Sequence, residues 1–438
     1  MDKYTFKVLE NNLKFLSIPS KKTKIVYLQL SFNVGSDLET LNPNTLEITH
    51  FLEHMYGAFT SKKYPESYKL LEKLELLGIE SDAYVNYNTT TYSLKGQSKY
   101  LEFMVDIFYN LFINFTVDNK YFEQERNAIV EEINSILNDG WIKLKEKVNS
   151  ELFPNHVREL SQRFNIKNTY KIQPEDLITF HKKYYNTNNT LISISGDYNT
   201  KTLNKIISLF KNIKKTGRPN KFPIIKTIKN KQKHKNLFYI KNDNVMSTNI
   251  YLVFKINIGR FDNRRYIIFA ILNILTNGLD SRLYKRLRGD SGLVYSIESD
   301  IDLGETSNTF SYISFSTQVL HKNVTKVIQI IMNQLNIIKN TKINPNEIKK
   351  FESDIEMGHL NSKLNKDPGI KLKQYSKYIL WGQKPLNDLE KYKLNMNITA
   401  DQILKMSKYI FDFNKIQIFY SGKKNYDKKI TEIINVFV

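Results

Sequence analysis

The chain has no cysteine among its 438 residues, which excludes disulfide bonds and metal sites built on thiolates. A metal would have to use imidazole and carboxylate ligands, and imidazole is scarce because only seven histidines are present. No apolar run reaches about 18 residues, so no transmembrane helix is predicted. The opening residues, MDKYTFKVLENN, resemble neither a secretory signal nor a transit peptide. We therefore expect a cytoplasmic protein without membrane attachment.

The composition is that of a globular protein with a strong basic excess. Hydrophobic residues make up 41% and charged residues 25%, and the length predicts two or three domains. The formal net charge of +21 favours anionic partners, which include nucleic acid. However, the lysines are spread along the chain and no recognised nucleic-acid-binding module accompanies them. Nucleic acid is therefore not expected as the partner, and a basic nucleic-acid-binding protein stays as the less favoured alternative.

The most informative stretch is NTLEITHFLEHMYGAF, residues 44–59. Read as a helix, it places its apolar residues on one stripe of a 3.6-residue period. The stripe consists of Ile48, Phe51, Leu52 and Met55. At roughly 100° per residue, His50, Glu53 and His54 fall together on the opposite side. This pattern predicts two imidazoles one turn apart, with a carboxylate between them.

The order His-x-x-Glu-His is the inverzincin signature. Two histidines at i and i+4 can supply neutral nitrogen ligands to zinc, and the Glu is close enough to water at the metal to take its proton. The pattern therefore predicts His50 and His54 as zinc ligands and Glu53 as the general base.

HFLEHM, followed by the turn Lys62, Lys63, Pro65, resembles the M16 peptidases, the group of pitrilysin, insulysin and mitochondrial processing peptidase. Members of that family take a third zinc ligand from a later helix with a segment close to E-R-N-A-x-x-x-E. The sequence ERNAIVEEI begins at Glu125. The resemblance implies that Glu132 is the third ligand of one zinc ion per chain and that Glu125 is its acidic companion.

Helix geometry supports Glu132 over its neighbour Glu131. The apolar stripe of the helix predicted over residues 118–138 consists of Phe122, Ile129, Ile133 and Ile136. Glu132 lies at the margin of this stripe, about 70° from its centre, with Glu125 on the same side, whereas Glu131 points away. A carboxylate at an inward margin is costly unless it is paired or metal-bound. Glu131 stays as the alternative ligand.

Residues 80–96, ESDAYVNYNTTTYSLKG, alternate in the manner of a strand. In the family, a strand with the signature N-A-[YF]-T lies beside the active site, where an extended substrate adds to the sheet edge. The corresponding residues here are Asp82, Ala83, Tyr84 and Val85. Asp for Asn and Val for Thr are departures, but strand addition uses backbone groups. The resemblance therefore implies substrate binding along Asp82, Ala83 and Tyr84.

The chain contains an internal duplication. A segment around Gly196 has a counterpart around Gly422, and SFNVG, ending at Gly35, matches KINIG, ending at Gly259. We predict a zinc-binding domain over residues 1–213, a basic linker over 214–236 and a domain without metal over 237–438. The expected fold class is α+β, with two homologous domains, each a largely antiparallel sheet with helices on one face, as in the LuxS/MPP-like metallohydrolases.

The second half contains SRLYKRLRGDSGLVYSI, residues 281–297, which resembles a substrate-binding segment of the family. The resemblance implies that Arg288 and Tyr295 bind the scissile carbonyl or the nearby substrate backbone, and both are donors suited to a developing oxyanion. Shorter members of the family pair up and complete the site with the partner's Arg and Tyr. We therefore expect a homodimer, or a heterodimer with a second M16-like chain.

The expected function is zinc-dependent endopeptidase activity on unfolded peptides or presequences. The alternative within the family is a non-catalytic subunit of a processing complex. The complete His50, Glu53, His54 and Glu132 set argues against that alternative, because such subunits usually lose ligands.

Overall fold

A computed structural model describes residues 4–39, 46–137, 140–159, 166–222, 236–243, 245–304, 310–364 and 367–438. The chain divides into two compact units, and each takes its residues from three segments. Unit 1 comprises Met1–Ile136, Asn155–Pro223 and Asn365–Leu386. Unit 2 comprises Leu137–Pro154, Ile224–Leu364 and Asn387–Val438.

The described residues of unit 1 form a six-stranded sheet in the order β1-β2-β6-β3-β5-β4. Its strands are β1 (Thr5–Val8), β2 (Lys14–Pro19), β3 (Ile25–Phe32), β4 (Glu80–Val85), β5 (Thr90–Gln97) and β6 (Thr190–Gly196). Only β2 and β6 pair in parallel, so the sheet is largely antiparallel, as predicted. Residues 80–96 form a hairpin of two strands rather than one strand, because Asn86 and Thr89 close a turn by a backbone hydrogen bond.

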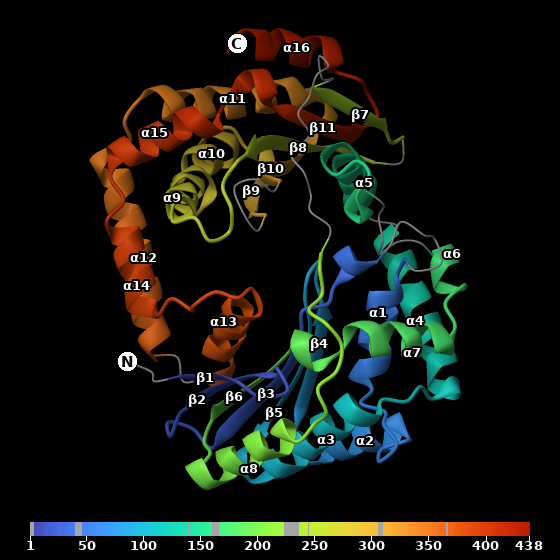
Figure 1. Cartoon of the computed structure of the whole chain (residues 1–438). Helices are drawn as coiled ribbons and strands as arrows, with labels where there is room; N and C mark the ends of the chain where they lie inside the picture. The colour runs from blue at the N-terminus through green and yellow to red at the C-terminus, as the bar shows by residue number, and fades with distance from the viewer. Residues whose placement is uncertain are drawn as a thin grey trace. The chain divides into compact units, whose positions relative to one another are not determined.

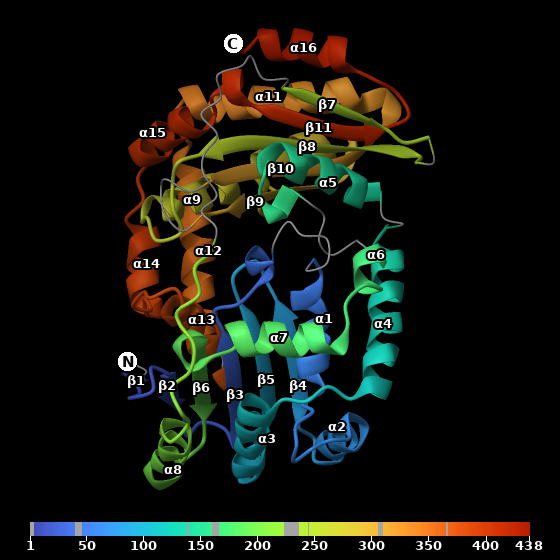
Figure 2. The same cartoon turned by 45° about the vertical axis from the view of Figure 1, so that its right-hand side comes forward.

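Most helices of unit 1 cover one face of this sheet (Figure 2). They are α1 (Ile48–Gly57), α2 (Ser67–Leu76), α3 (Leu101–Asn114), α4 (Asn119–Leu137), α6 (Ile166–Thr169), α7 (Pro174–Tyr184) and α8 (Thr200–Lys211). The core beneath them is rich in aromatic residues: Phe32 of β3 contacts Tyr56 of α1 and Tyr185 just after α7. These contacts hold α1 against the sheet.

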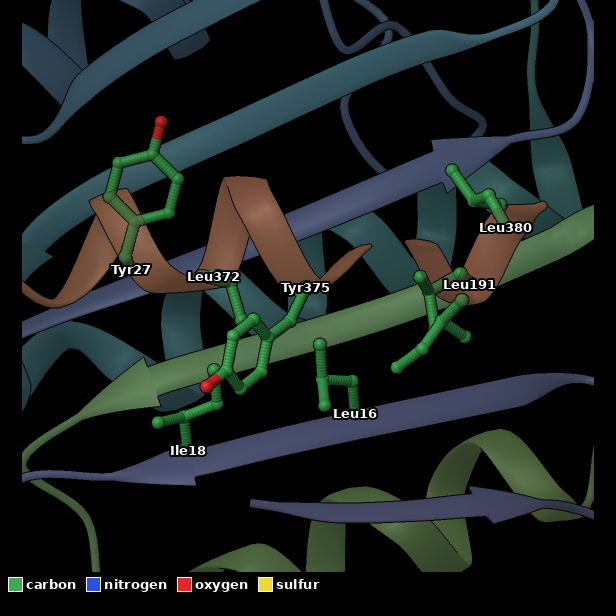
Figure 3. Packing of buried hydrophobic residues seen from close by; sticks show 8 residues of the cluster. Leu16, Ile18, Tyr27, Leu191, Leu372, Tyr375 and Leu380 are labelled. Atoms are coloured by element: carbon green, nitrogen blue, oxygen red, sulfur yellow. The ribbon is translucent and has the colours of Figure 1, made fainter. Parts of the chain in front are cut away.

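The other face of this sheet carries one helix, α13 (Pro368–Leu380), which comes from the second half of the chain. Leu372, Tyr375 and Leu380 of α13 pack on Leu16, Tyr27 and Leu191 of the sheet (Figure 3). Since neighbouring residues of a strand point to opposite faces, Tyr27 packs on the face covered by α13, whereas Val26 and Leu28 point to the face covered by the other helices.

Unit 2 repeats this design with five strands among its described residues, in the order β7-β11-β8-β10-β9. They are β7 (Leu237–Lys241), β8 (Ser247–Ile256), β9 (Val294–Asp302), β10 (Ser311–Leu320) and β11 (Gln417–Gly422). The helices are α5 (Gly140–Leu152), α9 (Arg264–Thr276), α10 (Arg282–Tyr284), α11 (Val324–Asn340), α12 (Pro345–Leu364), α14 (Asp388–Met396), α15 (Ala400–Ile410) and α16 (Asp427–Asn435). One face is covered by α11 and the other by α5, which comes from the first half of the chain (Figures 1 and 2).

The fold class is confirmed, and the duplicated segments occupy equivalent positions in the two sheets. β6 and β11 each pair in parallel with one strand and antiparallel with the next, and each ends at the predicted glycine. A Cβ on Gly196 would lie 2.1 Å from the carbonyl oxygen of Ile25, and one on Gly422 would lie 2.6 Å from the hydroxyl of Thr248. Only glycine allows these close approaches.

Two features differ from the predicted arrangement. Each sheet has a helix on its second face, and each of these helices is contributed by the opposite half of the chain. The predicted domain boundaries follow the chain, whereas the units exchange one segment each. Of the predicted linker, residues 223–235 lie outside the described residues. Among the described helices, none has the length and apolar character needed to cross a membrane.

Candidate metal centre

Helix α1 begins with an unusual turn that places its first histidine. Glu47 occupies the N-cap position with φ of 73°, in the left-handed region. Glu39, from the preceding segment, accepts hydrogen bonds from the backbone N–H groups of Glu47 at 3.2 Å and Thr49 at 3.0 Å, and from the Thr49 hydroxyl. A carboxylate that accepts the free N–H groups of a first turn stabilises the helix start.

Helix α4 lies beside α1 (Figure 2). The predicted stripe of α1 is buried, and that of α4 is buried except for Ile136, which is half-buried. Phe51 of α1 stacks on Phe122 of α4, with ring centroids 4.6 Å apart. Ile129 and Ile133 of α4 are fully buried. This packing turns Glu132, one position before Ile133, toward α1.

Three side chains meet between the two helices with distances that suit one metal ion. Oε2 of Glu132 lies 3.6 Å from Nε2 of His50 and 3.6 Å from Nε2 of His54. Zinc bonds of about 2.0–2.1 Å in a tetrahedral site put neighbouring ligand atoms roughly 3.3–3.4 Å apart. Both distances from Glu132 are therefore close to the separation of two ligand atoms on one zinc ion. Glu132 is itself 46% exposed, and its neighbour Glu131 is exposed on α4 as well.

The second nitrogen of each imidazole faces another carboxylate. Nδ1 of His54 lies 2.7 Å from Oε2 of Glu125, and Nδ1 of His50 lies 3.5 Å from Oε2 of Glu47. Metal-binding histidines commonly donate this N–H to a carboxylate, which fixes the tautomer and the ring orientation. Both rings are thus oriented with Nε2 toward Glu132.

The electrostatics of the cluster favour a positive charge at its centre. Burial opposes the charged form of His54, but hydrogen bonds to Glu125 and Glu132 outweigh it and raise its pKa to about 9. The pKa of His50 is also raised, since its contacts with Glu132 and Glu47 outweigh burial. The two imidazoles hold the pKa of Glu132 well below its usual range. Carboxylates that stabilise protonated imidazoles can stabilise a divalent cation in the same place.

Glu53 lies on the same side of α1 as the two histidines. One ligand atom each from His50, Glu53 and His54 lie within 4.8 Å of one another. Tyr92 and Tyr185 are buried near Glu53. Burial raises the pKa of Tyr92, and the neighbouring Tyr185 and Glu53 raise it further. The carboxylate of Glu53 therefore lies near both histidines and near the two buried phenols.

The predicted substrate strand is the edge strand β4, which contains Asp82, Ala83 and Tyr84. Among the described strands, β4 pairs only with β5, so the backbone groups of its other edge are unpaired by strands. A Cβ built on Gly57 of α1 would lie 3.6 Å from the Cβ of Ala83, so α1 packs directly on this strand. Asp82 lies 3.6 Å from the ammonium group of Lys373.

The predicted Arg and Tyr pair comes together in unit 2. Nη1 of Arg288 donates to the backbone carbonyl oxygen of Tyr295 at 2.6 Å, and its guanidinium lies 4.5 Å from the centre of the Tyr295 ring. Tyr295 is the second residue of β9 and is 79% exposed. Its phenol therefore stays accessible to another molecule.

Two family models match this chain. Residues 14–161 match the family model described as "Insulinase (Peptidase family M16)", and residues 171–351 match "Peptidase M16 inactive domain". The chain is a member of the M16 peptidase family. The first match contains the histidine cluster, and the second begins at residue 171, before the last strand of the first sheet.

Relatives of this M16 chain are named as zinc proteases. "Uncharacterized zinc protease" of Rickettsia felis is 23% identical over 94% of this chain and 95% of its own length. "Uncharacterized zinc protease YmxG" of Bacillus subtilis is 23% identical over 67% of this chain, and mouse insulin-degrading enzyme is 27% identical over 50%. The match spans 66% of YmxG and 22% of insulin-degrading enzyme.

A solved structure shares the fold of this M16 chain. A protease from Helicobacter pylori superposes with a TM-score of 0.81 at 17% identity, covering 96% of this chain and all of that one. The periplasmic protease PqqL of Escherichia coli also gives a TM-score of 0.81, and the match covers 100% of this chain and 50% of PqqL. At this identity the comparison supports the architecture alone.

Sequence reasoning missed Glu39 and Glu47 in this M16 chain. Glu47 stands three residues before His50, so helical spacing could have placed it on the same side as the histidines. What the sequence did not show is that both carboxylates are buried. His181, in contrast, is a core residue of α7 among Tyr56, Phe115 and Tyr185, and burial lowers its pKa to about 3.

Proposed function

We propose that the chain is a zinc metalloendopeptidase that hydrolyses unfolded peptides, with one zinc ion held by His50, His54 and Glu132. The observation that supports this most strongly is the position of Glu132 Oε2, 3.6 Å from Nε2 of each histidine. The zinc-protease names of its M16 relatives agree with this chemistry.

Bound zinc supplies a Lewis acid that lowers the pKa of water from 15.7 toward about 7. Glu53 accepts a proton from the attacking water and returns it to the amine that leaves. Glu125 holds the ring of His54, because its carboxylate lies 2.7 Å from Nδ1 and leaves Nε2 free to face the centre. The chain thus provides the base and fixes the orientation of the ligands.

The substrate part of the proposal places an extended peptide along β4. The unpaired edge of β4 can extend the sheet by backbone hydrogen bonds, with Asp82, Ala83 and Tyr84 as the pairing segment. Arg288 and the Tyr295 phenol are the donors proposed for the scissile carbonyl, whose oxygen gains negative charge during attack. A folded protein cannot present such a strand, and we therefore propose unfolded peptides as the substrate class.

The test is Glu53→Gln, measured with a fluorogenic peptide and by elemental analysis. Glu53 is not a proposed ligand, so the variant should keep about one zinc per chain. Its kcat/KM should fall by about 10²–10⁴-fold, since a positioned base contributes that much. Glu131→Gln, an exposed glutamate in α4, is the matched control and should keep both zinc and activity. Cleavage by Glu53→Gln at the wild-type rate would contradict the assignment.

We also propose that the active form is a dimer in which Arg288 and Tyr295 act on the partner's metal centre. Mixing Glu53→Gln with Arg288→Ala tests this idea. In a random mixture, about half the dimers are mixed, and one of their two sites has an intact Glu53 and an intact Arg288. Roughly a quarter of wild-type activity should return. A mixture as inactive as its two components, or a fully active monomer in light scattering, would contradict the proposal.

A further inference from the structure

Glu47 is held in a conformation that glutamate rarely adopts. Its φ of 73° and ψ of −2° lie in the left-handed region, where a side chain meets steric strain. Asn12, Phe59 and Asn155 share this region; asparagine tolerates it better, whereas Phe59, just after α1, is strained as well. Such strain persists only where the surrounding structure imposes it, and it concentrates at functional sites.

The strained residue is also buried, which adds a second cost. Glu47 is 1% exposed, and a buried carboxylate requires a partner. Its Oε2 faces Nδ1 of His50 at 3.5 Å. On the other side of the same ring, Nε2 faces Glu132 at 3.6 Å. The imidazole of His50 therefore lies between two carboxylates, one inside the protein and one at the metal centre.

We propose that Glu47 is a positioning residue that accepts the Nδ1–H of His50 and thereby holds Nε2 of that ring toward the metal. This inference rests on the proposed metal site. At 1% exposure Glu47 does not touch substrate, so its action is through His50.

The other histidine supports the inference, because its Nδ1 also faces a carboxylate, at a shorter distance than the 3.5 Å between His50 and Glu47. Glu125 faces Nδ1 of His54 from α4, at 2.7 Å. Glu47 is the N-cap residue of α1 and faces the ring of His50, three residues later in the same helix. A glycine at position 47 would remove the backbone strain but would leave Nδ1 of His50 without this acceptor.

The experiment compares zinc affinity, by competition with a chromogenic chelator, in wild type, Glu47→Gln and Glu47→Gly. The control is Asn155→Gly, an exposed residue at φ of 62° whose substitution changes only the backbone preference. Loss of a partner that orients a ligand typically costs 10–100-fold in metal affinity. We expect about that loss for Glu47→Gly and a smaller loss for Glu47→Gln, because the amide oxygen still accepts a hydrogen bond.

Two readouts separate positioning from a general structural role. The melting temperature of the metal-free Glu47→Gln variant should stay near that of wild type while its zinc affinity falls. Long-range ¹H–¹⁵N NMR of the zinc-loaded wild type should show His50 protonated at Nδ1. The KM for the peptide should not change in Glu47→Gln or in Glu47→Gly.

The outcomes are distinct for the inference and for the function on which it rests. Zinc affinities of both Glu47 variants within twofold of wild type would overturn the role of Glu47 and leave the metal site intact. A wild-type protein that binds no zinc would overturn the proposed function and this inference together. A loss of affinity in Asn155→Gly equal to that in Glu47→Gly would also overturn the inference, because backbone relief alone would then explain it.

Discussion

Replacing Glu132 with glutamine gives the most direct test of the metal centre. The variant keeps the size of the side chain and the packing of α4 but removes the anionic oxygen that faces both histidines. Structural zinc sites in small peptides bind the ion with about 10–16 kcal/mol, which amounts to roughly 2.5–4 kcal/mol for each of four ligands. Since about 1.4 kcal/mol is tenfold, the zinc affinity of Glu132→Gln should fall by about 10²–10³-fold.

One effect works against this loss. Glu132 also raises the pKa of His50 and His54 in the metal-free protein, so its removal lowers the competition from protons for the same nitrogens. The zinc affinity of Glu132→Gln should therefore fall by nearer to 10²-fold than 10³-fold at neutral pH. The loss should become larger at higher pH, where protons compete less with zinc for the histidine nitrogens. This pH trend distinguishes loss of a ligand from a general disturbance of the helix.

The assay is chelator competition at several pH values, with Glu131→Gln as the matched control. Glu131 is exposed on α4 and projects in a different direction from Glu132, since neighbouring residues of a helix are roughly 100° apart. Its substitution should change zinc affinity by less than about twofold. Wild-type affinity in Glu132→Gln together with a large loss in Glu131→Gln would refute the reasoning and assign the ligand to Glu131.

Two further predictions concern the segment that leads into α1. Arg158 donates to the Asp37 carboxylate at 2.9 and 2.6 Å with both side chains buried, so Arg158→Met should lower the free energy of unfolding in urea by about 3–5 kcal/mol. Lys205→Met, which breaks the exposed pair with Glu102, should change it by less than about 1 kcal/mol, and equal losses in the two variants would contradict this account. Burial and the nearby Glu47 raise the pKa of Glu39 to about 8 from an ordinary 4.5, so the folded protein favours the protonated form and loses this stabilisation as the pH rises through 8. Glu39→Gln should therefore lose less stability than wild type between about pH 6 and pH 9 in thermal unfolding, and parallel pH profiles would show that Glu39 does not titrate in this range.

The parts of the site that follow helical spacing could be predicted from the sequence. The 3.6-residue period placed His50, Glu53 and His54 on one side of α1 and distinguished Glu132 from Glu131, and the structure has the same arrangement. These relations are local, so they depend on helix geometry alone. That Glu132 of α4 joins the histidines of α1 came from the family resemblance, because helix periodicity says nothing about contacts between two helices.

The remaining features depend on contacts between distant segments. Burial of Glu39 and the strained backbone of Glu47 arise where the chain entering α1 folds onto the N-terminus of that helix. The exchange of α5 and α13 was also missed. An amphipathic helix shows which of its faces is buried, but its sequence does not say which sheet covers that face.

The exchange of helices has a consequence for synthesis of the protein on the ribosome. The last strand of the first sheet ends at Gly196, but the helix that covers its second face begins only at Pro368. At roughly 5–20 residues per second, the nascent chain waits on the order of ten seconds before that helix emerges. During this interval Leu16, Ile18 and Leu191 lack their final cover. Newly made chains should therefore depend on chaperones until translation is nearly finished.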